Sequence, residues 1–273
     1  AQTMLWSRRG IGGTRDSGSQ NLRFYRNEIA SKQNGDTIEN ILTKWKGKYG
    51  HLEASHTYIQ WLFPNTEDYG VNFDSSRLTE AEMKEMRDDP VIRDRVFRSY
   101  VMMLDFWGMR VDEDTGAITR AENHATRYAN WMGGHNNLRV CRCFKSIREL
   151  GLAFYCRPFA EFLMSEIFVG KLRGVSSSFW SFYVKTFPKN EQQELEAMWD
   201  AWKKAGKPML SRPASRSGRK ASELLTGPAA PVTAGAPVAA IAAVAAAAVA
   251  GSGGGETGVS SSSSSSSSSS APP

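Results

Sequence analysis

The stretch "TEAEMKEMRDDPVIRDRVFRSYVMMLDFWG" (79–108) decides the fold class, because it contains two helix starts and a helix end. Thr79 and Glu82 have the spacing of a capping box at a helix N-terminus. Pro90 then takes the first position of a second helix, where its missing N–H leaves no hydrogen bond unmade. Gly108 ends that helix. Its inward residues should be Ile92, Val96, Phe97, Tyr100, Val101 and Leu104.

The same start signals recur before and after this stretch. In "NGDTIENILTKWKGKYG", Asp36 and Glu39 have the box arrangement, and in "TRAENHATRYANWMGG" the pair is Thr119 and Glu122. Apolar residues then follow at helical spacing. We expect the inward residues of these two helices to be Ile38, Ile41, Leu42, Trp45, Tyr49, Ala121, Ala125, Tyr128 and Met132.

Later segments also have helical spacing: "NNLRVCRCFKSIRELG", "RPFAEFLMSEIFVG", "SSSFWSFYVKTFP" and "NEQQELEAMWDAWKKAG". Pro158 should open the second of these, and Asn190 with Gln193 should cap the last. We expect inward positions at Val140, Cys143, Phe144, Ile147, Leu150, Phe159, Phe162, Leu163, Ile167, Phe179, Phe182, Tyr183, Phe187, Leu195, Met198, Trp199 and Trp202. With about eight helices and few alternating strand patterns, we predict one all-α multi-helix domain over residues 19–205, after a flexible segment 1–18.

Residues 206–273 differ in composition from the rest, being rich in alanine, serine and proline. They lack the large apolar side chains that offset chain entropy, so we predict a disordered tail. The alanine run 238–251 is shorter than the roughly 20 apolar residues of a membrane-spanning helix. It therefore favours a low-complexity linker over a span, and the serine tract 260–270 favours a solvated spacer.

The net charge is +6, and half of it lies in the tail, so the folded part is only mildly basic. This argues against strong nucleic-acid binding, which depends on many phosphate contacts. The chain has three cysteines and no disulfide-like spacing, which favours a reducing compartment. No secretory signal is evident, and the first residue is alanine, which indicates a fragment or a processed product.

The run "HLEASHTYIQWLFPN" (51–65) contains two of the four histidines. His51 and His56 lie about 140° apart on a helix, so they do not share a face as a pair of metal ligands would. The shared face is apolar and consists of Tyr58, Ile59, Leu62 and Phe63, which indicates a core helix ended by a proline. Gln60 and Trp61 point the other way and would be available to a ligand.

Catalytic and metal motifs give no positive signal. The spacing of Cys141 and Cys143 is too tight for a zinc knuckle, and Cys156 with His135 matches no metal signature, so core cysteines are favoured. No phosphate-binding loop or nucleophile elbow occurs, although spacing alone leaves a Cys–His pair open. We therefore expect no enzyme, no metal and no cofactor.

A basic residue recurs at every third position of one predicted helix: Arg139, Arg142, Lys145 and Arg148. The simplest interpretation is a solvated helix face. The functional alternative is a docking face for an acidic partner or a phosphate backbone.

Several motifs together resemble the conserved domain of the opioid growth factor receptor family. They are "LRFYRNEIASKQNGDTIENILTKWKGKYGHLEASHTYIQWLFPN" (22–65), with "YIQWLFP" (58–64) the most specific part, then "RSYVMMLDFWGMR" (98–110), "RAEN" (120–123) and "HNNLRVCRCFKSIRELGL" (135–152). The resemblance weakens toward residue 205. The long C-terminal repeat array of some family members has no counterpart in the tail, which puts any function of that array in doubt.

The resemblance implies a helical protein of the nucleus and perinuclear membranes, unlike seven-helix opioid receptors. It implies binding of the pentapeptide methionine-enkephalin, Tyr-Gly-Gly-Phe-Met, and restraint of cell proliferation. Its partners would be this peptide and nuclear import or other regulatory proteins, together with peripheral association with membranes. The segment "SRPASRSGRK" (211–220) is a weak basic cluster for nuclear import.

Such a peptide offers an ammonium, two rings and a thioether, so its site needs a carboxylate and an aromatic lining. Asp105, beside large apolar residues, and Glu28, after Phe24 and Tyr25, are candidates for the carboxylate. The alternative for each is an ordinary ion pair with a nearby arginine. The full set of candidate ligand-binding residues is Glu28, Tyr58, Gln60, Trp61, Asp105 and Trp107.

By this resemblance, we predict that the protein is a non-enzymatic peptide receptor and growth regulator. Two alternatives stay open: a helical scaffold for protein interactions without peptide-receptor activity, and a nucleic-acid-associated helical domain.

Overall fold

The computed structural model describes residues 19–32, 35–67, 75–131 and 134–210. The predicted flexible segment 1–18 and most of the predicted tail, including the alanine run and the serine tract, lie outside these residues. Among the described residues, no helix combines the length and the apolar character needed to cross a membrane. The prediction of an all-α domain is confirmed, with one small two-stranded sheet added.

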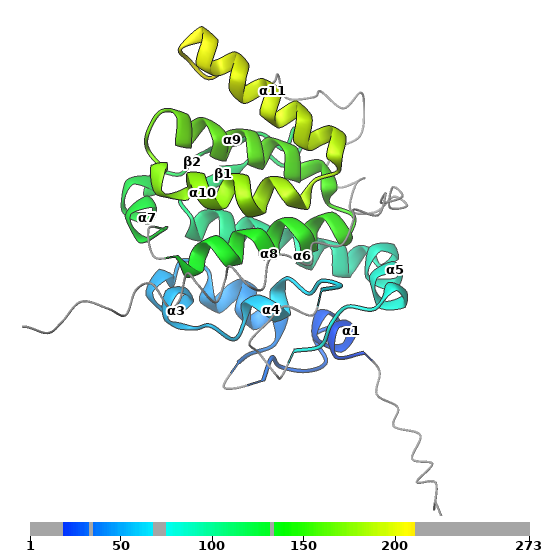
Figure 1. Cartoon of the computed structure of the whole chain (residues 1–273). Helices are drawn as coiled ribbons and strands as arrows, with labels where there is room; N and C mark the ends of the chain where they lie inside the picture. The colour runs from blue at the N-terminus through cyan, green and yellow to red at the C-terminus, as the bar shows by residue number, and fades with distance from the viewer. Residues whose placement is uncertain (1–18, 33–34, 68–74, 132–133, 211–273) are drawn as a thin grey trace, which may run out of the picture. The chain divides into compact units, whose positions relative to one another are not determined.

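Two long helices, α6 (Pro90–Phe106) and α8 (His135–Glu149), lie against each other through the middle of this domain (Figure 1). Short helices from the N-terminal part of the domain lie on one side of this pair: α1 (Gln20–Tyr25), α2 (Ile38–Asn40), the π-helix η1 (Ile41–Trp45), α3 (Tyr49–Ala54), α4 (Ile59–Leu62) and α5 (Glu80–Asp88). The early segments of the chain therefore pack on one side of two later helices.

The C-terminal elements cover the other side of the pair (Figure 1). Helix α7 (His124–Trp131) leads toward α8, and α9 (Cys156–Phe168) packs on α8. The remaining elements are η2 (Ala153–Tyr155), η3 (Arg173–Val175), α10 (Ser176–Ser178), the π-helix η4 (Phe179–Tyr183), η5 (Val184–Thr186) and α11 (Lys189–Ala205).

The local signals around α5 and α6 are confirmed. Thr79 Oγ1 accepts from Glu82 N at 3.2 Å, and Glu82 Oε2 accepts from Thr79 N at 2.6 Å, which completes the capping box. Pro90 opens α6 and Asp89 caps it by accepting from Val91 N at 2.8 Å. These signals succeed because every partner lies within one helical turn.

The predicted box at Asp36 and Glu39 is wrong. Asp36 accepts from the N–H of Thr37 at 2.9 Å, while the Glu39 carboxylate pairs with Arg95 and Arg98 of α6. The predicted single helix is broken into α2, η1 and α3. A glycine at position 47, with φ +76°, makes the turn before α3.

The predicted helix start at Thr119 is also wrong. Thr119 lies in β2 (Ile118–Arg120), which pairs antiparallel with β1 (Met109–Val111), and α7 begins only at His124. β-Branched residues fit this short hairpin well. As a consequence Ala125, expected inward, is exposed, and Met132 lies outside the described residues.

Two smaller boundary predictions are wrong. Helix α9 begins at Cys156 rather than Pro158, and α11 begins at Lys189 after Pro188 instead of being capped by Asn190. Both helices exist where the spacing predicted them.

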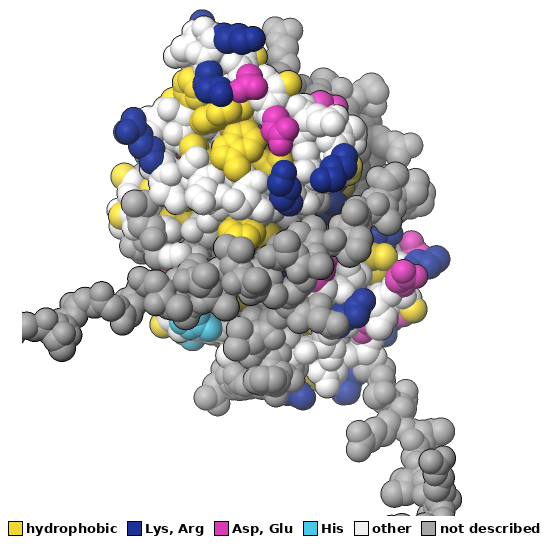
Figure 2. Space-filling view, in the orientation of Figure 1, with side chains coloured by type: hydrophobic (Ala, Val, Ile, Leu, Met, Phe, Trp, Pro, Cys, Tyr) yellow, Lys and Arg dark blue, Asp and Glu magenta, His cyan; other side chains and the backbone are white. Residues whose placement is uncertain are grey.

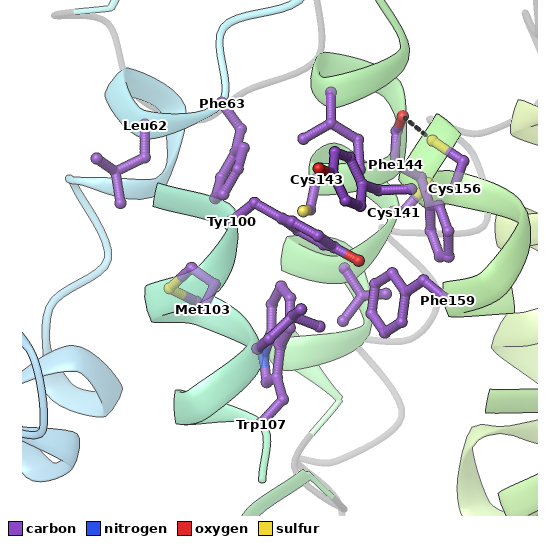
Figure 3. Close-up of a cluster of buried hydrophobic side chains, with 14 of the residues drawn as sticks. Leu62, Phe63, Tyr100, Met103, Trp107, Cys141, Cys143, Phe144, Cys156 and Phe159 are labelled. Carbon is purple, nitrogen blue, oxygen red and sulfur yellow. Dashed lines mark hydrogen bonds between the residues drawn. The ribbon is translucent and has the colours of Figure 1, made fainter. Parts of the chain in front are cut away.

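The core contains a cluster of aromatic rings from α6, α8 and α9 (Figure 3). Phe159 stacks on Phe144 at 4.7 Å and on Trp107 at 6.2 Å between ring centroids, and it meets Tyr100 edge-on at 5.9 Å. The predicted inward residues are buried, except that Tyr49, Val101, Phe182, Met198 and Trp199 are half-buried and those noted above differ. Ring stacking thus joins α6 to the consecutive helices α8 and α9.

Candidate functional site

A half-buried polar cluster lies where the C-terminal end of α6 meets the starts of α3 and α7. The Tyr49 hydroxyl donates to Asp105 Oδ2 at 2.9 Å and accepts from Asn123 Nδ2 at 2.9 Å. The Arg127 guanidinium lies 4.3 Å from the centre of the Tyr49 ring. Each of these side chains keeps part of its surface exposed, so the cluster is accessible from solvent. We call these four residues the Asp105 cluster.

Gly108 makes the cluster possible. Its φ is +83°, and a Cβ at this position would lie 2.9 Å from Arg127 Cβ and 2.9 Å from His124 Cα. Any other residue would push α7 away from the end of α6. The glycine that the sequence marks as a helix end therefore also allows α7 to approach the end of α6, where Asn123 and Arg127 contact Tyr49.

The electrostatics of the cluster leave a carboxylate with a neutral partner. Burial and the hydrogen bond to Asp105 raise the pKa of Tyr49, so the phenol remains a protonated donor at neutral pH. Within the described part of the chain, Asp105 forms no ion pair. The predicted alternative, a pairing of Asp105 with a nearby arginine, is therefore wrong, because Arg127 lies over the Tyr49 ring.

One turn further along α3, Glu53 is held by two residues of α8. His135 Nε2 lies 2.7 Å from Glu53 Oε1, and Asn136 Nδ2 donates to both carboxylate oxygens at 3.3 and 3.2 Å. Burial and the charge of Arg139 lower the pKa of His135, so this imidazole is neutral at neutral pH. The His56 ring lies 5.4 Å from the His135 ring. Glu53 of α3 and Asp105 of α6 are thus two carboxylates that accept hydrogen bonds from neutral groups, the Asn136 amide and the Tyr49 hydroxyl.

Three of the candidate ligand-binding residues belong to the core. Tyr58, Trp61 and Trp107 are at most 1% exposed. The expectation that Trp61 points outward is wrong, because α4 has only four residues and is covered on both sides. The Trp61 ring lies 5.3 Å from the Phe24 ring of α1. Gln60 is half-buried.

Glu28 lies just after α1 and is not one of the four residues of the Asp105 cluster. Its carboxylate is 3.6 Å from Arg23 Nε, and about half of each side chain is exposed. An exposed pair of this kind contributes little stability and leaves Glu28 as an ordinary surface residue. Of the six candidates, Asp105 alone combines a half-buried carboxylate with aromatic neighbours.

The predicted basic docking face on α8 is wrong, and so is its simpler interpretation as a solvated face. Arg139 is 4% exposed and donates to the carbonyl oxygens of Leu52 and Ser55 at 3.0 and 2.7 Å. Arg142 Nε donates to the carbonyl of Phe63 at 2.8 Å. Burial lowers the pKa of Arg142 to about 10.

The other two basic residues of α8 are also engaged. Lys145 pairs with Glu67, and Arg148 lies 3.3 Å from Glu191 and 4.5 Å from the centre of the Phe187 ring. The segment after α3 runs along α8, and its irregular backbone leaves carbonyl groups that need donors. The arginine and lysine side chains supply these donors and the counter-charges.

The cysteines are buried free thiols, as the core interpretation predicted. Burial raises the pKa of Cys141 to about 11 and that of Cys156 to about 12, so neither is a reactive thiolate at neutral pH. Among the residues that the structure describes, no group of three or more His, Cys, Asp or Glu side chains could hold a metal ion.

Sequence reasoning identified Asp105 but missed Tyr49, Asn123 and Arg127 as its companions. Tyr49 looked like the last member of an apolar stripe, and no sequence signal pointed to Arg127. Asn123 does belong to the "RAEN" motif, which was the one available signal.

Comparison with known proteins agrees with these motifs. Residues 14–211 match the family model described as the opioid growth factor receptor conserved region. The chain belongs to the opioid growth factor receptor family. It is 40% identical to the opioid growth factor receptor of Rattus norvegicus over 185 residues, which cover 67% of this chain and 32% of the rat protein.

Two other relatives show how broad the family is. The Homo sapiens opioid growth factor receptor is 42% identical over 168 residues, covering 60% of this chain and 24% of the human protein. The Mus musculus opioid growth factor receptor-like protein 1 is 38% identical over 178 residues, which cover 64% of this chain and 38% of the mouse protein. The chain thus matches between about a quarter and two fifths of the length of these relatives. No solved structure matches the chain.

Proposed function

We propose that this member of the opioid growth factor receptor family is a non-enzymatic receptor for a short opioid peptide of the enkephalin type. The family assignment and the names of the relatives support a receptor role. The observation that carries the site is the Asp105 carboxylate, whose recorded partner is the neutral hydroxyl of Tyr49. Such a carboxylate can accept a peptide ammonium without first losing a cationic partner.

The surroundings of Asp105 suit the remaining chemistry of Tyr-Gly-Gly-Phe-Met. The partly exposed Tyr49 ring adjoins the carboxylate, and the buried Phe106 ring lies behind it at 6.5 Å between ring centroids. Asn123 offers an amide group beside both. The flexible peptide must lose conformational freedom on binding, so we expect an affinity in the micromolar range, about −8 kcal/mol or weaker.

Isothermal titration calorimetry with the pentapeptide tests the proposal. The full chain should release or absorb heat with saturable binding, and the N-acetylated peptide should bind at least about tenfold more weakly because it lacks the ammonium. If the full chain shows neither heat nor a thermal shift at millimolar peptide, peptide binding is wrong.

The variant Asp105→Asn tests the assigned carboxylate, and Asp94→Asn on the same helix is its matched control. Asp94 is 46% exposed and pairs with Arg98 at 3.4 Å, at the other end of α6. Asp105→Asn should weaken binding about tenfold or more, and Asp94→Asn should leave it unchanged. Equal affinity in both variants, with an intact fold, would reject the role of Asp105 while leaving the receptor proposal standing.

Growth restraint in the nucleus and perinuclear cytoplasm is the cellular part of the proposal, and it rests on the family resemblance. A fluorescent fusion should localise there, and its expression should slow proliferation in the presence of the peptide. The Asp105→Asn fusion should localise in the same way without slowing growth. Equal slowing by both fusions would separate growth control from peptide binding.

A helical interaction scaffold without peptide-receptor activity is the second candidate. A partly exposed group of aromatic side chains on the C-terminal elements favours it. The alternative would be supported if calorimetry with the pentapeptide shows no heat and the chain binds itself or a partner through that surface.

A further inference from the structure

Three aromatic side chains form a partly exposed patch on the C-terminal elements. Trp199 of α11 meets Trp180 of η4 at 5.5 Å and Phe168 at the end of α9 at 5.3 Å, both in T-shaped geometry. We call these three residues the tryptophan patch. Figure 2 shows apolar side chains gathered between α11 and the segment of α10, with charged side chains of both signs around them. Half-exposed tryptophans in a contiguous group mark interaction surfaces.

The charges beside the patch have an ordered arrangement on α11. Glu196 lies one turn before Trp199 and Lys203 one turn after it, and their side chains are 53% and 56% exposed. At these spacings the three residues lie along one stripe of the helix. The stripe therefore reads acidic, aromatic, basic from its N-terminal to its C-terminal end.

Such a stripe is complementary to its own reverse. If two α11 helices pack antiparallel about a twofold axis near Trp199, Glu196 of each copy lies opposite Lys203 of the other. A twofold interface repeats each contact, so two ion pairs would flank a centre of tryptophan rings. A stripe with one sign of charge, by contrast, would call for a different partner of opposite charge.

We propose that the tryptophan patch and its two flanking charges form a homodimer interface, with a second copy of this chain as the occupant. Within one chain, Glu196 and Lys203 do not pair with each other but with other residues. Glu196 lies 3.9 Å from Lys185, and Lys203 lies 2.7 Å from Asp200, both as exposed pairs that a partner can replace at little cost. The inference is independent of peptide binding at Asp105.

Sedimentation velocity on the full chain, over about 1 to 200 µM, tests the proposal. The wild-type chain should show a concentration-dependent monomer–dimer equilibrium. Lys203→Glu or Glu196→Lys should weaken dimerisation by about tenfold, because each places like charges opposite one another twice. The double variant with both changes should restore it, since the swap rebuilds the opposite-charge pairs.

Lys204→Glu is the matched control, because it makes the same charge change about 140° round the helix from Trp199. It should dimerise like the wild type, and circular dichroism should show all variants folded. A chain that stays monomeric over the whole range overturns the proposal. So does a dimer that Lys203→Glu and Lys204→Glu affect equally, or one that the charge swap fails to restore.

Discussion

Nη2 of Arg139 donates a 2.7 Å hydrogen bond to the carbonyl oxygen of Ser55, which lies 84 residues earlier in the chain. The same guanidinium donates to the carbonyl of Leu52 at 3.0 Å and lies 5.6 Å from the centre of the Tyr58 ring. One buried arginine of α8 therefore supplies hydrogen-bond donors to carbonyl groups at the end of α3. It also holds the segment that leads into α4.

Arg139→Ala should lower the free energy of unfolding by about 2–4 kcal/mol, because it leaves buried carbonyls without donors and removes ring packing. Urea denaturation measures this change. The adjacent Leu138→Ala is the control, since Leu138 is 44% exposed and should change stability by less than about 0.5 kcal/mol. A similar small change for both variants would show that Arg139 has no structural role.

Removing the hydroxyl from each of two buried tyrosines should change the free energy of unfolding differently. The Tyr100 hydroxyl is buried and has no hydrogen-bond partner within the described part of the chain, whereas the Tyr25 hydroxyl donates to the carbonyl of Leu62. Tyr100→Phe should leave stability unchanged or raise it by up to about 1 kcal/mol, and Tyr25→Phe should lower it by about 1 kcal/mol. Chemical denaturation of both variants checks this order, and a larger cost for Tyr100→Phe would contradict it.

The Glu39 carboxylate should make the fold sensitive to acid. Hydrogen bonds from Arg98, opposed in part by burial and reinforced by Arg95, lower the pKa of Glu39 to about 2. Its side chain is 32% exposed, so screening reduces the contribution to roughly 1–2 kcal/mol. Because the folded pKa is depressed, this stability is complete above the unfolded pKa of about 4.5 and is lost as the pH falls toward 2.

The measurement is the free energy of unfolding at pH 6 and at pH 3 for the wild type and for Glu39→Gln. The wild type should lose more stability between these two values than the variant does. An equal loss in both proteins would show that other carboxylates account for the acid sensitivity.

Two of the capping boxes expected from the sequence, those at Thr79 and Thr119, should behave differently on mutation. Thr79→Ala should cost about 1 kcal/mol, since Thr79 accepts from Glu82 N at 3.2 Å at the start of α5. Thr119→Ala should cost less than about 0.5 kcal/mol, since Thr119 is an exposed residue of β2. Thermal unfolding of the two variants should separate them, and equal shifts would mean that the cap of α5 contributes nothing.

Some features of the candidate site can be recognised in the local sequence, and others depend on contacts between residues that are distant in the sequence. Asp105 is recognisable because a lone carboxylate stands among large apolar residues in the sequence. Its neighbour Tyr49 is not, because the contact joins residues 56 positions apart. Gly108 carries a visible signal as a helix end, but its close approach to α7 depends on how the two helices cross.

The sequence by itself determined that the chain folds as helices and where α5 and α6 begin, because capping and proline placement act within one turn. It also determined which residues share a helix face. Only the tertiary structure decided what each face meets. Periodicity distinguishes two sides of α8, yet Arg139 and Arg142 are inside because an irregular segment with unpaired carbonyls covers that side. A polar stripe on a helix is therefore exposed to solvent only when no other segment of the chain packs on it and takes up its hydrogen bonds.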